Sequence, residues 1–110
     1  MTKSEQRQRG MIGFAMRAGK LIIGTELISK TVAKNRSAVK LVVLAGNASL
    51  GTTKKLTNKC EFYQIKLIQI NISTDELGAL LGKTYSPAAV GITDEGFAKE
   101  IEKASLGEIN

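Results

Sequence analysis

The sequence contains no histidine, no tryptophan and only one cysteine, Cys60. Histidine is the side chain that most often moves protons near neutral pH, so its absence argues against the common forms of acid–base catalysis. Zinc sites built from histidine and cysteine ligands are excluded for the same reason. One cysteine cannot form a disulfide within the chain, which favours a reducing compartment such as the cytoplasm. We expect no metal site and no cofactor.

Long hydrophobic runs and a secretion signal are also missing. No apolar run approaches the roughly 18 residues that a membrane-spanning helix needs. The first ten residues, MTKSEQRQRG, are polar and lack the apolar segment of a secretory signal. From these absences we expect a cytoplasmic protein that does not enter a membrane.

The residues that are present are typical of one small globular domain. The chain has 110 residues, of which 43% are apolar, too many for a disordered segment. It contains one proline, Pro87, and we find no repeat, linker or low-complexity tract. We therefore expect residues 1–110 to form a single domain around one core, and to act as a monomer.

Charge is distributed unevenly along the chain. The net charge is +6, but residues 1–60 carry a balance of +10 and residues 61–110 a balance of −4. Small, strongly basic domains often bind nucleic acid, so this distribution favours a face for a polyanion. Two alternatives remain open: a soluble protein with a lopsided surface, and a protein-interaction module whose acidic half meets a basic partner.

The hydrophobic pattern alternates between helix and strand. This predicts a layered α/β domain with helices on both faces of a four-stranded sheet. Helices are expected at about 4–18, 25–34, 50–61, 75–81 and 94–104, and strands at 21–23, 41–45, 67–71 and 88–92. In such sheets, ligands bind at loops beyond the carboxyl ends of the strands. Three junctions qualify: 23–25, 45–47 and the loop GKTYSP at 82–87.

Local signals define several helix starts. Thr2 with Glu5 fits a capping box, in which two side chains satisfy amides at the beginning of a helix. Ser73 with Glu76 fits the same pattern before the fourth helix. Thr93 is expected to cap the last helix.

The stretch KLIIGTELISK, at 20–30, is the first candidate site. An apolar strand ends at Gly24 and a helix starts at once. The residues expected on the inner side of that helix are Leu27, Ile28, Thr31 and Val32. The polar residues expected on its outer side are Thr25, Glu26, Ser29 and Lys30. Because first-turn amides lack helical partners and carry partial positive charge, a phosphate or a base edge can bind there.

Two of these side chains allow two interpretations. Lys30 could donate to a guanine edge or a phosphate, and Glu26 could accept from amino protons on a base. Alternatively, the two residues lie four apart and form an ordinary helical ion pair worth about 0.3–0.5 kcal/mol. The spacing alone favours neither interpretation over the other.

A second candidate is the stretch GNASLGTT, Gly46 to Thr53. It follows a buried strand and opens a helix, as a phosphate-binding loop does. However, Thr52 stands where that motif has the lysine that contacts the phosphates. We therefore interpret the stretch as a strand-to-helix turn, and keep a nucleotide- or phosphate-binding domain as the alternative function.

The remaining candidates do not form a catalytic centre. Cys60 has no histidine to activate it, so a structural thiol is expected. We find no two acids that could act as a catalytic pair, and we expect no enzyme activity. In the loop 82–87, Tyr85 could stack on an unpaired base beside Lys83. Packing of the tyrosine on the protein's own surface is the alternative.

Three segments together resemble a known family: IIGTELISK, VKLVVLAGNAS and ELGALLGKTYSPAAVGITDEGFA. They are similar to the seven-Ae (L7Ae-like) family of kink-turn RNA-binding proteins, in particular to its small bacterial members of the YlxQ type. The resemblance covers nearly the whole chain. It implies a three-layer α-β-α sandwich with a mixed four-stranded sheet. It also implies structured RNA as the partner, with ribosomal RNA as one candidate, and a place in a ribosome or another ribonucleoprotein.

The resemblance also indicates where RNA would bind. In that family the RNA site is the glycine-led start of the second helix plus the loop before the last strand. The family motif there reads G-x-N-E-x-[TS]-K. Gly24, Ser29 and Lys30 match it, whereas Glu26 stands at the asparagine position and Leu27 at the glutamate position.

By the same resemblance, Thr25 near the glycine and Lys83 with Tyr85 in the second loop are further candidates for RNA contacts. A kink-turn is an RNA duplex sharply bent at a bulge, next to tandem sheared G·A pairs. The resemblance implies a protein that selects this bent shape and clamps it, without chemistry.

Overall fold

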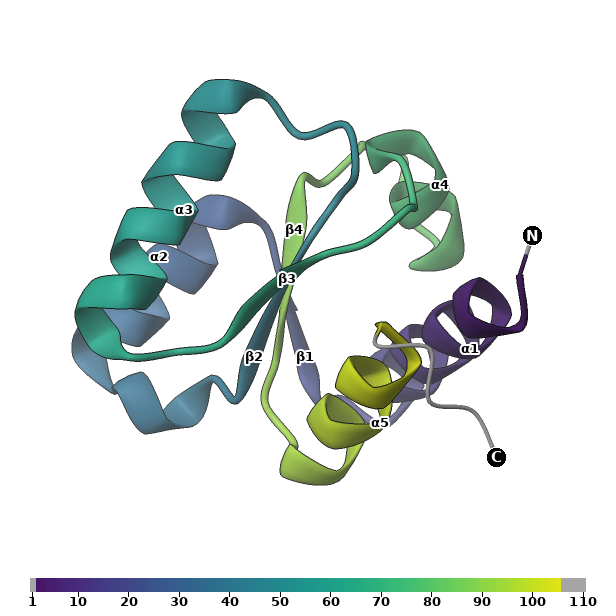
Figure 1. Ribbon diagram of the computed structural model, residues 1–110, viewed down its shortest axis with the longest axis horizontal. Helices are drawn as coiled ribbons and strands as arrows, with labels where there is room; N and C mark the ends of the chain where they lie inside the picture. The colour runs from purple at the N-terminus through teal and green to yellow at the C-terminus, as the bar shows by residue number, and fades with distance from the viewer. Residues whose placement is uncertain (1, 106–110) are drawn as a thin grey trace.

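The computed structural model describes residues 2–105, and in it a four-stranded sheet lies between two layers of helices. The helices are α1 (Lys3–Arg17), α2 (Thr25–Lys34), α3 (Leu50–Tyr63), α4 (Thr74–Leu80) and α5 (Glu95–Ser105), with a short 3-10 helix, η1 (Arg36–Ala38). The strands are β1 (Leu21–Ile23), β2 (Leu41–Leu44), β3 (Leu67–Gln69) and β4 (Ala89–Ile92). Figure 1 shows α2 and α3 on one face of the sheet and α1, α4 and α5 on the other. The predicted α-β-α sandwich is confirmed.

The sheet is mixed, as the family resemblance implied. Its strand order is β1-β4-β2-β3, with β4 antiparallel to β1 and β2, and with β3 parallel to β2. The register pairs Ile23 with Val90 and Leu44 with Ala89. The ends of β1, β2 and β3 therefore lie beside the beginning of β4, at one end of the sheet. We call this the upper end, since it is at the top of Figure 1, and the opposite one the lower end.

Apolar side chains fill the space on both faces of the sheet. All residues of β2 are buried, as its continuous apolar sequence indicates, and so are all residues of β4. Cys60 lies in the core between the sheet and the α2–α3 layer, and its burial raises the pKa of its thiol to about 11. This agrees with the predicted structural role. None of the helices among residues 2–105 has the length and apolar character to cross a membrane.

Helix starts follow the predicted signals, with one exception. Both capping boxes form, Thr2 with Glu5 and Ser73 with Glu76. The prediction that Thr93 caps the last helix is wrong. Its amide donates to the Lys20 carbonyl at 2.9 Å and so continues the sheet. The cap is Asp94, whose carboxylate accepts from an amide of the first turn of α5.

Three glutamates outside the candidate sites have a lowered pKa, among them Glu76 and Glu100. The pKa of Glu76 falls from 4.5 to about 2, chiefly because the Ser73 amide donates to its carboxylate, and then because Arg9 does. The pKa of Glu100 is also lowered, because its carboxylate accepts a hydrogen bond from Arg7. Both carboxylates are thus stabilised in their charged form in the folded state.

Stability is therefore expected to fall as the pH is lowered from about 4.5 to about 2. Since the folded-state pKa lies below the unfolded-state pKa, the contribution is present above the unfolded value and is lost on protonation. Glu76→Gln keeps a similar shape without the charge, so it should lose less stability than the wild type between pH about 6 and about 3 in urea unfolding. Equal losses in the two proteins would contradict the role given to Glu76.

Candidate nucleic-acid interface

The start of α2 differs from the other helix starts in residues 2–105. Gly24 precedes the helix with φ 100° and ψ 147°, a conformation that side chains rarely allow. Its amide donates to the Ala89 carbonyl at 3.0 Å, which fixes the glycine at the upper end of the sheet. No side chain caps α2, whereas a side-chain oxygen caps each of the other four α-helices.

An uncapped helix start leaves amide groups directed at whatever lies beyond it. These amides carry partial positive charge, because they have no partner one turn earlier in the helix. Glycine at the cap position adds no side chain above them, so a ligand backbone can approach closely. The geometry therefore suits an anion or an electron-rich base edge at the beginning of α2.

The side chains of α2 lie partly as predicted. Glu26 and Lys30 are exposed and Thr25 is half-buried. Two predictions are wrong: Ser29, expected outside, is only 8% exposed, and Leu27, expected inside, is 49% exposed. The outer side of α2 near its start thus consists of Glu26, Leu27 and Lys30.

The buried side of α2 is rotated relative to the predicted stripe. Its buried residues are Ile28, Ser29 and Val32, and the helix contacts β1, β4, η1 and α3. The elements that surround α2 therefore cover Ser29 and leave Leu27 in solvent. The Ser29 hydroxyl is buried and has no hydrogen-bond partner among the described residues.

The alternative interpretation of Glu26 and Lys30 as a helical ion pair is not what the structure shows. Neither residue takes part in any of the ion pairs found among residues 2–105. Leu27 lies three residues before Lys30 on the same exposed side. At the open helix start, the exposed Leu27 side chain therefore lies beside Glu26 and Lys30, which have no ion-pair partner among the described residues.

The loop 82–87 is fixed in place by α4. The amide of Lys83 donates to the Gly78 carbonyl at 2.9 Å, and the Ser86 hydroxyl donates to the Asp75 carboxylate. Gly78 lies directly against the Tyr85 carbonyl, so close that a Cβ at this position would overlap it. The Tyr85 side chain is 55% exposed. The loop thus holds its tyrosine out toward solvent in a defined place.

The two parts of the candidate site lie at the same end of the molecule. The loop leads into β4 at Ala89, where the carbonyl that accepts from Gly24 is located. Figure 1 shows the loop joining β4 at the top, on the side of α4, while α2 begins on the other face of the sheet. The structure therefore brings Gly24 and the end of the loop together. Lys83 and Tyr85 lie on the α4 side of this edge.

The second candidate, Gly46 to Thr53, is occupied by internal contacts. A Cβ at Gly46 would come within 2.7 Å of the Ile70 carbonyl, so the glycine is needed for close packing. The Ser49 hydroxyl caps α3, and the Asn47 side chain accepts from the Thr74 amide at 2.8 Å. These contacts agree with the predicted strand-to-helix turn, and nothing in them favours the phosphate-loop alternative.

The excess positive charge lies on the α2–α3 layer rather than on the whole first half of the chain. Arg7 and Arg9 of α1 pair with Glu100 and Glu76 from the second half, so the two halves partly neutralise each other. The segment 24–66 contains eight Lys or Arg and two acids. Its exposed lysines in α2 and α3, which form no ion pair among residues 2–105, are Lys30, Lys34, Lys54 and Lys55.

Three of these lysines, Lys34, Lys54 and Lys55, were not singled out as site residues from the sequence. Only the large number of lysines and arginines in residues 1–60 indicated that these side chains could contribute to binding. Their common exposure on one layer adds a phosphate-attracting surface beside the start of α2.

The chain is similar to known proteins over most of its length. A family model described as the ribosomal protein L7Ae/L30e/S12e/Gadd45 family matches residues 6–102. The chain is 37% identical over 104 residues to the RNA-binding protein YlxQ of Enterococcus faecium, covering 94% of this chain and 96% of that protein. It is 36% identical over 91 residues to the RNA-binding protein YlxQ of Bacillus subtilis, covering 83% and 87%. A solved structure of a protein of unknown function from Bacillus halodurans C superposes with a TM-score of 0.80 at 32% identity, covering 89% of this chain and 95% of that one.

Proposed function

Because the chain belongs to the ribosomal protein L7Ae/L30e/S12e/Gadd45 family, we propose that it binds structured RNA of the kink-turn type. Its relatives of similar length are named RNA-binding proteins, which supports a binding role without chemistry. The observation that carries the proposal is the uncapped, glycine-led start of α2 on the basic layer. Ribosomal RNA is the candidate partner, and the protein acts as a monomer in the cytoplasm.

The start of α2 supplies the main contacts. Lys30 donates to the O6 and N7 acceptors of an exposed guanine, or to a phosphate nearby. Glu26 accepts from amino or imino protons on a base. The amides after Gly24 and the Thr25 hydroxyl face the crowded backbone of the bent duplex.

Two residues of the motif act differently from their family counterparts. Leu27 is exposed but has no polar atom in its side chain, so it packs against a base or a ribose and reads no hydrogen-bond pattern. Ser29 is buried, so it belongs to the packing of α2 and does not contact RNA. Target choice then depends chiefly on Glu26 and Lys30.

The loop 82–87, on the α4 side of the sheet, supplies a stacking surface. The exposed ring of Tyr85 stacks on an unpaired base of the kink, and Lys83 approaches a phosphate. Since α4 holds the loop, little conformational entropy is lost on binding. The protein thus favours RNA molecules that already populate the kinked shape and shifts the remaining ones toward it.

Binding to a labelled kink-turn RNA tests this function directly. The control RNA has the same length and bulge, but Watson–Crick pairs replace its tandem G·A pairs. We expect the kink-turn to bind at least about tenfold more tightly, a difference of about 1.4 kcal/mol. Equal affinities would contradict kink-turn recognition and leave only general RNA binding.

A further inference from the structure

The lower end of the sheet carries a basic cleft, far from the start of α2. It lies between η1 and the end of α3 and has a volume of about 380 Å³. Three cationic residues, Arg36, Lys40 and Lys66, line it, and no acidic residue does. Such a lining is suited to a phosphate group.

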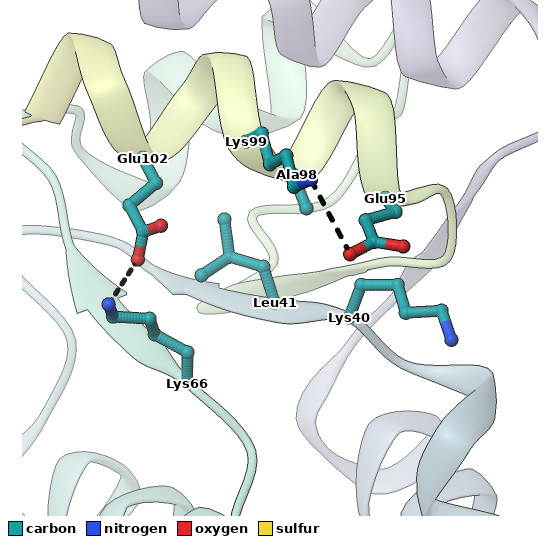
Figure 2. Close-up of a pocket in the computed structure, with 7 residues that line it drawn as sticks. All are labelled: Lys40, Leu41, Lys66, Glu95, Ala98, Lys99 and Glu102. Carbon is teal, nitrogen blue, oxygen red and sulfur yellow. Dashed lines mark ion pairs between the residues drawn. The ribbon is translucent and has the colours of Figure 1, made fainter.

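Two of the three cations are available to a ligand. Figure 2 shows the neighbouring pocket, in which Lys66 pairs with Glu102 of α5 and Lys40 extends away from the acids. Arg36 donates to the Tyr63 carbonyl at 3.2 Å, which orients its guanidinium at the end of α3. The remaining N–H groups of this guanidinium have no carboxylate partner among residues 2–105.

An aromatic pair, Phe62 and Tyr63, lies at the end of α3, and Tyr63 is its member that lines the cleft. Phe62 is 79% exposed, which is unusual for a phenylalanine in a small protein. Its ring contacts the Tyr63 ring edge-to-face, with the centroids 4.9 Å apart. Tyr63 lines the cleft, and the Lys59 ammonium lies 5.9 Å from the centre of its ring. Phe62 is the exposed ring of the pair, whereas Tyr63 is half-buried and packs against the core under α2 and α3. An exposed aromatic ring near cations is typical of surfaces that stack unpaired bases and bind the adjoining phosphates.

The upper and lower ends are connected by the basic layer. The helices α2 and α3, which carry the exposed lysines, run between the two ends of the sheet (Figure 1), and α3, with 14 residues, is about 21 Å long. An RNA strand that leaves the upper end along this layer passes these lysines. The cleft is therefore within reach of an RNA held at the upper end.

We propose that the Arg36–Tyr63 cleft is a second RNA site, which binds an unpaired segment flanking the structured RNA. A base stacks on Phe62 and Tyr63 while Arg36 and Lys40 hold its phosphates. The proposal rests on RNA binding as the proposed function, but it uses none of the residues at the start of α2. The protein then holds two parts of one RNA, or two RNA strands, at opposite ends of its sheet.

Titration with a labelled oligouridylate of about ten nucleotides tests this site, because such an RNA has no stable secondary structure. The double variant Arg36→Gln/Phe62→Ala should bind it at least about fivefold more weakly than the wild type does. A matched control is Phe14→Ala/Arg17→Gln on α1. There an arginine lies over an exposed phenylalanine, 4.7 Å from the ring centre, but on the other layer. This control should bind like the wild type.

A third variant separates the two sites. Lys30→Ala should weaken oligouridylate binding much less than Arg36→Gln/Phe62→Ala does, while it weakens kink-turn binding more, so failure of one proposal is distinguishable from failure of the other. The second site is overturned if the wild type does not bind oligouridylate, or if the Arg36→Gln/Phe62→Ala variant binds it as well as the wild type does. It is also overturned if Lys30→Ala causes the same loss, since the oligonucleotide then occupies the upper end.

Discussion

Alanine in place of Gly78 is expected to lower the free energy of unfolding by about 1–3 kcal/mol, although alanine is the better helix former. The added methyl group would overlap the Tyr85 carbonyl, a backbone atom that cannot rotate away. Relief requires the whole loop 82–87 to move from α4. The variant should therefore also weaken kink-turn binding, because Tyr85 and Lys83 lose their fixed positions.

Urea unfolding of this variant and of Gly51→Ala provides the measurement and its control. Gly51 lies in α3, and no atom comes within 4 Å of the position that a Cβ would take there, so alanine adds helix propensity without a clash. We expect Gly51→Ala to raise stability by up to about 1 kcal/mol. If both variants were stabilised equally, the close approach between α4 and the loop would not exist in solution.

Elements with local signals could be predicted from the sequence. The bounds of α2 follow from Gly24 at its start and from the apolar spacing after it, and the structure gives the same residues, Thr25–Lys34. Both capping boxes were predicted because their two partners lie three residues apart. Where the determining contacts are close in sequence, a pattern is enough to place the element.

The orientation of α2 could not be predicted in the same way. Hydrophobicity placed Leu27 inside and Ser29 outside, but burial also depends on the elements that pack around α2, of which α3 and β4 come much later in the chain. Once these elements surround α2, the serine is buried and the leucine faces solvent. The polarity of single residues therefore misled the prediction at the position where the family motif has glutamate.

The distribution of charge over the folded surface could not be predicted from the sequence either. A basic first half predicted a basic face, yet Arg7 and Arg9 of α1 lie against acids of α5 and α4 and are neutralised there. Only the α2–α3 layer keeps its excess. The aromatic pair at 62–63 was missed for a related reason: α3 was predicted to end at 61, so these rings were not placed on a helix beside η1.

Alanine in place of Lys30 is expected to weaken kink-turn binding by about 1–3 kcal/mol, or about 5- to 150-fold, the largest effect of any single side chain. Lys30 is exposed and has no ion-pair partner among residues 2–105. It lies on the exposed side of α2, close to the open start of the helix. Since it makes no contact that stabilises the fold, urea unfolding of the variant should match that of the wild type.

The matched control is Lys34→Ala, one turn further along α2 on the same exposed side. Lys34 is too far from the helix start to reach a base held there, so it should contribute only general attraction to phosphates. Binding measured at several salt concentrations separates the two roles, because loss of one phosphate contact lowers the salt slope by about 1. If Lys30 reads a guanine edge, Lys30→Ala keeps the wild-type slope and loses discrimination between the kink-turn and the RNA without G·A pairs. Equal losses of affinity in both variants would show that Lys30 acts as one more surface cation. Another residue at the start of α2 would then have to recognise the base.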